Sequence, residues 1–281
     1  INTIKFFYRI NRDGEVLNKY DQTGDFFSKV NFNEDEATVY KNDKLYMGIK
    51  MNVPAKGDTN FLRAIFNMKT NTIEEKYVDE RLIVPDYEAK RDKTEEMSKS
   101  GGVSSVSIDF VGDDEWLVSG TSVGDSLYFF KDFKLTGVYY AGDPEVEVTN
   151  FDGYFDRMYT EQLSGGGIRI GPRTEQPAFF THLFLSPDRK KVYRIFIHGT
   201  KGVIPEGGTV EQPKLISASL IVFDVATKTS THLPLPIEEL NMSYSSDDIL
   251  VTPDGMLFPV KDMESESEKV YKVLKVKSSN E

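Results

Sequence analysis

Short strands joined by tight turns recur along this chain, and residues 179–235 show the pattern most clearly. Residues 192–197 (VYRIFI) and 220–225 (LIVFDV) are runs of β-branched, aromatic and aliphatic side chains, which favour strands. Residues 186–190 (SPDRK) supply turn chemistry, because proline presets φ while serine and aspartate hydrogen-bond their own backbone. Polar and apolar residues then alternate at 230–233. The stretch therefore predicts two antiparallel hairpins in tandem, which make one four-stranded unit.

Similar hairpins are expected over most of the remaining chain, at residues 4–20, 38–51, 61–78, 103–119, 126–140 and 249–260, with a last strand at 270–276. The aspartates of equivalent turns, Asp43, Asp114, Asp188 and Asp254, are 71, 74 and 66 residues apart. This spacing exceeds the roughly 40–50 residues of a common propeller blade, so either the blades carry long loops or some repeats contain a second, weaker blade. The sequence predicts an all-β fold, a β-propeller of four-stranded antiparallel blades. Six blades are expected, with five or seven as alternatives, and the N-terminal strands close the ring.

The propeller is expected to form a single domain over residues 1–281, with two departures from the pattern. Residues 87–99 (YEAKRDKTEEMSK) are charged and have almost no apolar face, which indicates a short exposed helix or an insert. Residues 142–177 are glycine-rich and break the strand pattern. This irregular segment either contains one degenerate blade or runs as a long excursion over one face of the domain.

Composition excludes several classes of function. A net charge of −11 argues against nucleic acid and an anionic membrane surface as partners, since both attract basic proteins. The chain has no cysteine, so disulfides and thiolate metal sites are impossible, and no cofactor is expected. No apolar run approaches the roughly 18 residues of a membrane span. The chain opens INTIKFFYRI, so we expect that a signal or lipid-anchor segment preceded it and was removed.

Four residues are candidates for a binding site. Arg169 and Arg173 lie beside the glycines of residues 165–171, and arginines on such a loop can clamp a carboxylate or a sulfate. His182 and His198 flank one predicted hairpin and could meet near one end of it if the register allows, where a metal pair is an alternative to two ordinary interior or surface histidines.

One further motif carries less weight. Residues 120–124 (GTSVG) match the nucleophile-elbow pattern of hydrolases, but a strand follows them where the elbow requires a helix. We therefore interpret them as a turn of small residues between two strands. No residue is assigned a catalytic or a metal-binding role.

The repeated pieces resemble a known group of proteins. Residues 184–193 (FLSPDRKKVY) and 251–257 (VTPDGML) resemble the SPDG-type hairpin of TolB-like bacterial propellers, and residues 220–228 (LIVFDVATK) resemble the strand that follows it in those blades. The chain is also similar to uncharacterised six-bladed propeller lipoproteins of Bacteroidetes-type bacteria. That resemblance implies an envelope protein, periplasmic or anchored to the outer membrane. It transfers no functional residue, because the matched residues serve turns and packing.

The function expected from these observations is a non-catalytic binding or scaffold propeller of the bacterial cell envelope. The expected partner is a protein, or a small-molecule or carbohydrate ligand, and the chain is expected to be a monomer. The alternative is a carbohydrate-active or lactonase-like enzyme with its site in the central channel, where carboxylates and a histidine would converge. The third hypothesis is a protein–protein interaction platform that works through the blade edges or residues 87–99.

Overall fold

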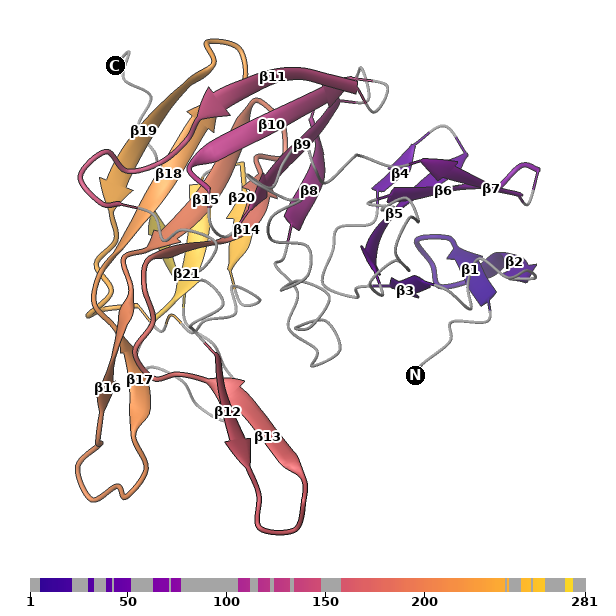
Figure 1. Cartoon of the computed structure of the whole chain (residues 1–281). Helices are drawn as coiled ribbons and strands as arrows, with labels where there is room; N and C mark the ends of the chain where they lie inside the picture. The colour runs from indigo at the N-terminus through magenta and orange to yellow at the C-terminus, as the bar shows by residue number, and fades with distance from the viewer. Residues whose placement is uncertain are drawn as a thin grey trace. The chain divides into compact units, whose positions relative to one another are not determined.

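The structure is a computed structural model, and every element it describes is a β-strand (Figure 1). It describes residues 6–21, 30–32, 39–41, 43–51, 63–70, 72–76, 106–111, 116–121, 124–131, 134–147, 158–240, 242, 249–253, 255–260 and 271–274. The charged stretch 87–99 lies outside these residues. The chain divides into two compact units, Ile1–Val103 and Ser104–Glu281. Within the described residues no helix is long and apolar enough to cross a membrane. All named strand pairs are antiparallel, which confirms the predicted all-β class.

The first unit contains a hairpin and a larger sheet. The hairpin pairs β1 (Phe6–Ile10) with β2 (Val16–Asp21) across a turn that Asn11 organises by accepting hydrogen bonds from the amides of Asp13 and Glu15. In the sheet, β3 and β4 pair with successive parts of the long strand β5, so together they take the place of one edge strand. The bounds of its strands are β3 Val30–Phe32, β4 Val39–Lys41, β5 Lys44–Met51, β6 Arg63–Asn67 and β7 Thr72–Lys76.

The second unit contains two four-stranded sheets. The first has the order β11-β10-β9-β8 and the second the order β14-β15-β18-β19. The second sheet confirms the tandem hairpins predicted for residues 179–235. Their strands are β8 Val106–Val111, β9 Trp116–Thr121, β10 Ser126–Lys131, β11 Lys134–Tyr140, β14 Phe179–Leu185, β15 Lys191–Ile197, β18 Ala218–Asp224 and β19 Thr229–Pro234.

Three smaller sheets complete the described part of this unit. The irregular segment 142–177 contains the hairpin β12–β13, and a second hairpin, β16–β17, is inserted between β15 and β18. This second hairpin is not among those that the sequence predicts. A three-stranded sheet follows in the order β20-β21-β22. The bounds are β12 Met158–Gln162, β13 Ile168–Pro172, β16 Thr200–Val203, β17 Gln212–Leu215, β20 Leu250–Thr252, β21 Gly255–Pro259 and β22 Tyr271–Leu274.

The two central strands of the β14-β15-β18-β19 sheet, β15 and β18, are buried on both faces. The even-numbered β15 residues, such as Val192 and Phe196, pack in a cluster with Leu127 and Phe129 of the β8–β11 sheet. The odd-numbered β15 residues from 193 to 197 join a second cluster that includes Met256 and Phe258 of β21. A strand covered on both sides needs apolar residues at every position, which explains why residues 192–197 and 220–225 do not alternate.

The two four-stranded sheets meet with equivalent strands side by side. The first strand of each sheet contacts its counterpart, β8 against β14, and the last strands also meet, β11 against β19. The sheets therefore stack face to face in the same orientation, with their shared core between them.

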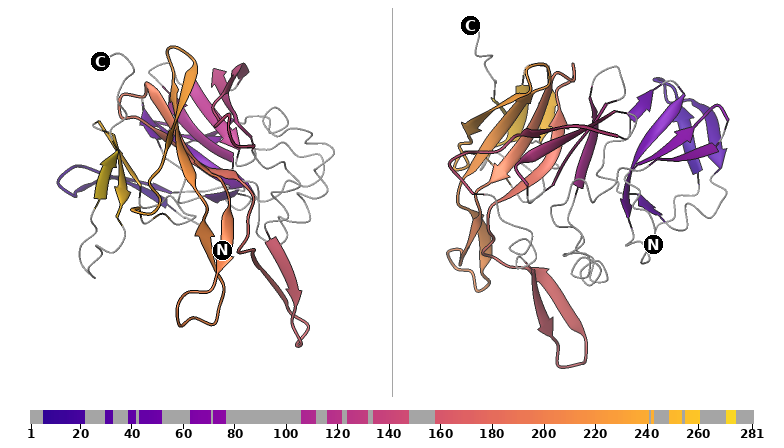
Figure 2. Two further views of the ribbon diagram at one scale, coloured as in Figure 1. Left: turned by 90° about the vertical axis from the view of Figure 1, so that its left-hand side faces the viewer. Right: turned by 45° about the horizontal axis from the view of Figure 1, so that its top comes forward.

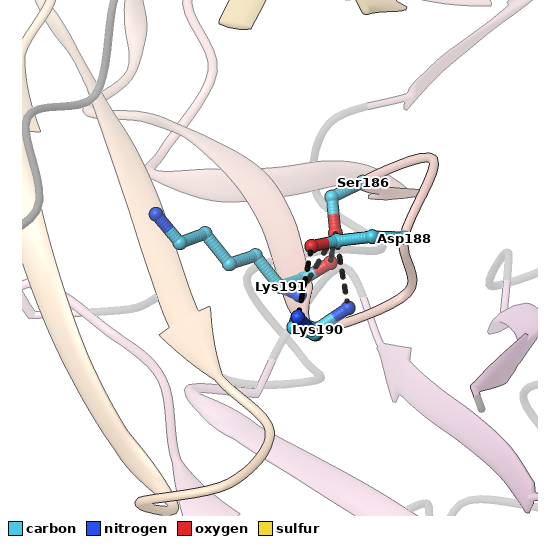
Figure 3. A network of polar contacts seen from close by, with 4 residues as sticks. All are labelled: Ser186, Asp188, Lys190 and Lys191. Carbon is cyan, nitrogen blue, oxygen red and sulfur yellow. Dashed lines mark hydrogen bonds and ion pairs between the residues drawn. The ribbon is translucent and has the colours of Figure 1, made fainter. Parts of the chain in front are cut away.

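The turn between β14 and β15 is organised by its own side chains (Figure 3). The Ser186 hydroxyl donates to Asp188 Oδ1 at 2.7 Å and accepts from the Lys191 amide at 2.9 Å. Asp188 Oδ1 also accepts from the Lys190 amide at 3.1 Å, and Arg189 adopts the left-handed backbone conformation with φ 57°. This is the turn chemistry predicted for the SPDRK sequence.

Candidate functional site

The structure places the four predicted site residues at separate points of the second unit. Arg169 lies in β13 opposite Glu161, and Arg173 follows that strand with an exposed side chain. His182 lies in β14 where the pairing with β15 shifts register, whereas His198 directly follows β15. The register sets the two histidines about three residues, or ~10 Å, apart along the strands, so the hairpin does not bring them together as a pair.

The side chain of His198 belongs to a polar cluster with Ser217, Ser219 and Asp143. Its Nδ1 lies 2.7 Å from Ser217 Oγ, and its Nε2 lies 3.0 Å from Ser219 Oγ and 3.5 Å from Asp143 Oδ2. Ser219 Oγ donates to Asp143 Oδ2 at 2.9 Å. Because Ser219 Oγ carries one proton, it accepts from Nε2–H, and the ring then receives the Ser217 proton at Nδ1. The tautomer with its proton on Nε2 thus satisfies the hydrogen bonds of His198, Ser217 and Ser219 at once.

Strand register and one connector assemble this cluster. His198 and Ser217 are a cross-strand pair, joined through the His198 amide and the Ser217 carbonyl at 3.0 Å. Ser219 lies two residues further along β18, so it shares their face of the ribbon. Asp143 comes from residues 141–147, which follow β11; we call these residues the connector. Its carboxylate accepts from the Glu145 amide at 3.0 Å, which fixes the connector's turn.

Burial and the neighbouring polar groups together set the pKa values of the two titratable groups, Asp143 and His198. Burial favours a raised pKa for Asp143, but hydrogen bonds from the Glu145 amide and Ser219, with the nearby His232 and His198, hold that pKa below its usual value. Burial lowers the pKa of His198, His232 lowers it further, and Asp143 opposes both. At neutral pH the cluster therefore holds an ionised carboxylate beside a neutral imidazole.

Arg194 makes a second tie between the same two sheets. It is 1 % exposed, donates from Nη2 to the Gly124 carbonyl at 2.9 Å and from Nη1 to the Ala141 carbonyl at 3.4 Å, and its guanidinium carbon lies 3.7 Å from the centre of the Phe180 ring. Burial lowers the pKa of Arg194 to about 9, so the side chain still carries its charge at neutral pH. A Cβ at Gly120 would lie 3.3 Å from the guanidinium, so a glycine at this position lets the arginine pack closely.

The cluster has the residue types of a hydrolase triad but not the same arrangement. Ser219 and Asp143 lie at the same ring nitrogen, and Ser219 is only 2 % exposed and directs its proton to the carboxylate. Ser217 is the hydroxyl on the opposite nitrogen, where the neutral ring can accept a proton. Across the part of the chain that the structure describes, no three acidic, histidine or cysteine side chains are grouped to hold a metal ion.

Sequence reasoning found His198 but missed its partners. Asp143 and Ser219 are 76 residues apart, and the contact between them depends on how two sheets pack. Arg194 did leave a signal, because it is a lone charge inside the apolar run 192–197. A charge in such a run indicates a buried side chain that bonds to neighbouring elements rather than a surface residue, since long charged side chains are rarely buried without partners.

Comparison with known proteins finds similarity at the level of the fold. No protein-family model matches the chain, and no curated protein matches it. The crystal structure of a member of the DUF4221 family from Bacteroides vulgatus is similar, with a TM-score of 0.58 and 14 % identity over 97 % of this chain and 74 % of that one. A virginiamycin B lyase from Staphylococcus aureus matches with a TM-score of 0.25 and 11 % identity over 85 % and 84 % of the two chains, and that likeness is too low to support an argument. At this identity, the first likeness concerns the fold alone.

Proposed function

We propose that this chain is a non-catalytic binding or scaffold module of the bacterial cell envelope. The observation that carries the proposal is that the His198 cluster has a structural role. Asp143 and Ser219 are 5 % and 2 % exposed, and their hydrogen bond ties the connector to the neighbouring sheet. Buried polar groups that satisfy one another in this way hold a structure together.

Three exposed apolar side chains lie on the inserted hairpin, outside its paired strands. Ile204, Val210 and Ile216 are 67 %, 70 % and 54 % exposed. The hairpin β16–β17 extends away from its sheet in both views of Figure 2. Large exposed apolar side chains on a projecting element favour contact with another protein. We therefore propose that this hairpin contacts a protein partner, with a small-molecule or carbohydrate ligand as the alternative.

The proposed architecture is a six-bladed, TolB-like β-propeller whose ring the N-terminal strands close. Two observations support it. The β8–β11 and β14–β19 sheets stack with first strand beside first strand and last beside last, as successive blades do. Among the described residues the sheet β20-β21-β22 has three strands, one fewer than a complete blade.

Envelope localisation rests on the sequence resemblance to Bacteroidetes propeller lipoproteins. It is tested by expressing the natural full-length gene in its own host and separating cytoplasmic, periplasmic and membrane fractions. Recovery with the periplasm or outer membrane supports the proposal, and recovery with the cytoplasm contradicts it.

The binding role is tested on the hairpin. A photo-crosslinking amino acid at position 204 is expected to trap one protein of defined mass in cells of the source organism. The double substitution Ile204→Ser with Val210→Ser is expected to prevent the same protein from co-purifying. The matched control is Leu250→Ser, which changes an exposed leucine on β20 and leaves the hairpin intact. If the double variant retains the partner, the hairpin is not the binding surface.

One observation favours a second candidate, the carbohydrate-active or lactonase-like enzyme. Ser217 Oγ lies 2.7 Å from a neutral imidazole nitrogen, a distance at which histidine can activate a hydroxyl. A fluorophosphonate probe distinguishes the candidates. Labelling that Ser217→Ala and His198→Gln both abolish would favour the enzyme, whereas an unlabelled wild-type protein would show that Ser217 is not activated and remove the observation that favours this candidate.

A further inference from the structure

The inserted hairpin continues the ladder of β15 and β18. The pairs from Lys191↔Asp224 to Ile197↔Ala218 and from Thr200↔Leu215 to Val203↔Gln212 follow one register. Between them, the His198 amide donates to the Ser217 carbonyl and the Ile216 amide donates to the Gly199 carbonyl, each at 3.0 Å. Residues 191–203 and 212–224 therefore form one long ribbon, and His198 lies where the ribbon leaves the sheet.

Backbone conformation marks the same place as a bend. Gly199 has φ 114°, a conformation that L side chains rarely adopt, and a Cβ there would lie 2.8 Å from the Gln176 carbonyl oxygen. Thr200 pairs with Gln176 and donates through its hydroxyl to the Thr174 carbonyl at 2.8 Å. The direction of the projecting hairpin is thus set within two residues of His198.

The imidazole of His198 links this bend to the neighbouring sheet. On one side it accepts from Ser217, the partner residue at the bend. On the other side it contacts Ser219 and Asp143, and Asp143 belongs to the connector that follows β11. One ring therefore joins the base of the hairpin to the connector.

Protonation changes this ring's hydrogen bonding. A proton on Nδ1 turns that atom from an acceptor into a donor, so the Ser217 hydroxyl must rotate and find another acceptor. The titratable groups that face the ring are Asp143 on the connector and His232 on β19. His232 opposes a positive ring while Asp143 favours it, and burial, which is the largest of the three influences on the His198 pKa, disfavours the charged ring.

We propose that His198 is an acid-sensitive latch whose protonation loosens the connector 141–147 and the base of the β16–β17 hairpin together. The ring is neutral and the latch closed at neutral pH. As the pH falls through the ordinary histidine pKa, the unfolded or opened form takes up the proton more readily than the closed form, so opening becomes easier. The hairpin that we propose as the binding surface would then change its direction or mobility with pH.

Hydrogen exchange of the full-length chain at pH 7.5 and pH 5.5 tests the proposal, after correction for the intrinsic pH dependence of exchange. We expect protection of residues 141–147 and 198–217 to fall several-fold more than protection of β21, because the opened form takes up a proton that the closed cluster disfavours. His198→Gln should abolish that difference. His182→Gln is the matched control and should retain it, because it removes a different histidine of the same sheet.

A second measurement, an NMR titration of the histidines, uses the wild-type protein and so does not depend on whether a variant folds. The chain has three histidines, so their ring proton resonances can be followed one by one in the wild-type protein. The proposal requires one of them to titrate below the ordinary range, and the loss of protection to develop between the ordinary histidine pKa and that midpoint. It is overturned if all three titrate normally, if the two segments respond no more than β21, or if His198→Gln retains the acid response.

Discussion

Individual buried polar residues, alongside the hydrophobic core, connect the two four-stranded sheets to each other. Arg194 donates to the carbonyls of Gly124, which precedes β10, and of Ala141, which follows β11. Ser219 donates to Asp143, which also follows β11. Two residues of the second sheet therefore bind the segments that flank the β10–β11 hairpin. Such ties are sensitive to substitution because removing one partner leaves the other buried and unsatisfied.

Arg194→Met should lower the free energy of unfolding by about 3 kcal/mol, because the carbonyls of Gly124 and Ala141 lose a charged donor while the side-chain volume is largely kept. Urea titration followed by circular dichroism measures the change. Arg173→Met is the matched control on an exposed arginine and should change stability by less than about 0.5 kcal/mol. Equal effects of the two substitutions would contradict the role given to Arg194.

Asp143 should make the protein sensitive to acid at a lower pH than His198 does. Its pKa in the folded chain lies below the ordinary 3.8, so the ionised carboxylate stabilises the fold above that pH, and the contribution is lost as the pH falls through the folded pKa. Asp143→Asn should therefore flatten the decline in the urea midpoint below about pH 4. Glu206→Gln, on the exposed hairpin loop, should leave the decline unchanged.

At the scale of elements, side-chain caps in the turns fix which strands pair. The Ser186–Lys191 turn joins β14 to β15, and its two hydrogen bonds to Asp188 Oδ1 hold the chain in the reversing conformation. The Ser186 hydroxyl and the Lys190 amide also lower the pKa of Asp188, which indicates that the ionised form makes these bonds.

Asp188→Ala should lower the free energy of unfolding by about 1 kcal/mol, the usual contribution of hydrogen bonds at an exposed cap. Thermal and urea unfolding measure it. Asp188→Asn should recover part of the loss, because the amide oxygen can still accept from the backbone. A variant as stable as the wild type would show that the proline and the left-handed residue suffice for the turn.

The sequence predicted these turns and strands because their signals are local. Residues 186–190 carry the turn chemistry, and the apolar runs 192–197 and 220–225 give both central strands. The strands β16 and β17 were missed because Lys201, Gly202 and Pro213 give no apolar alternation. Their pairing is inherited from the register of β15 and β18, which local patterns do not express. For the same reason His198 was a candidate from sequence, whereas its partners Asp143 and Ser219 required the packed sheets.

At the scale of the whole second unit, stability should depend on the core between the sheets. Phe223 is fully buried on β18, and its ring centre lies 5.4 Å from that of Phe129 and 5.9 Å from that of Tyr139, both on the neighbouring sheet. Lys228 makes a cation–π contact with this aromatic group, with its amine 4.3 Å from the centre of the Phe129 ring. The two sheets therefore share one aromatic core.

Phe223→Ala should lower the free energy of unfolding by about 3–5 kcal/mol, the usual cost of deleting a buried phenylalanine. Hydrogen exchange should show loss of protection in β10 and β11 as well as in β18, because the cavity lies between the sheets. Leu233→Ala on β19 is the control, with an expected loss below about 1 kcal/mol because its side chain is partly exposed. Loss confined to the β14–β19 sheet would mean that the sheets unfold independently.

The long ribbon formed by residues 191–203 and 212–224 also bears on the order of events during folding. Its two arms are joined by residues 204–211 alone, so the first contacts close a short loop at little entropic cost. Pairing can then spread from Val203↔Gln212 towards Lys191↔Asp224 one residue at a time. The two central strands of the most buried sheet would thus meet early, through local contacts. The rest of the unit, whose contacts join distant parts of the chain, would assemble more slowly around this nucleus.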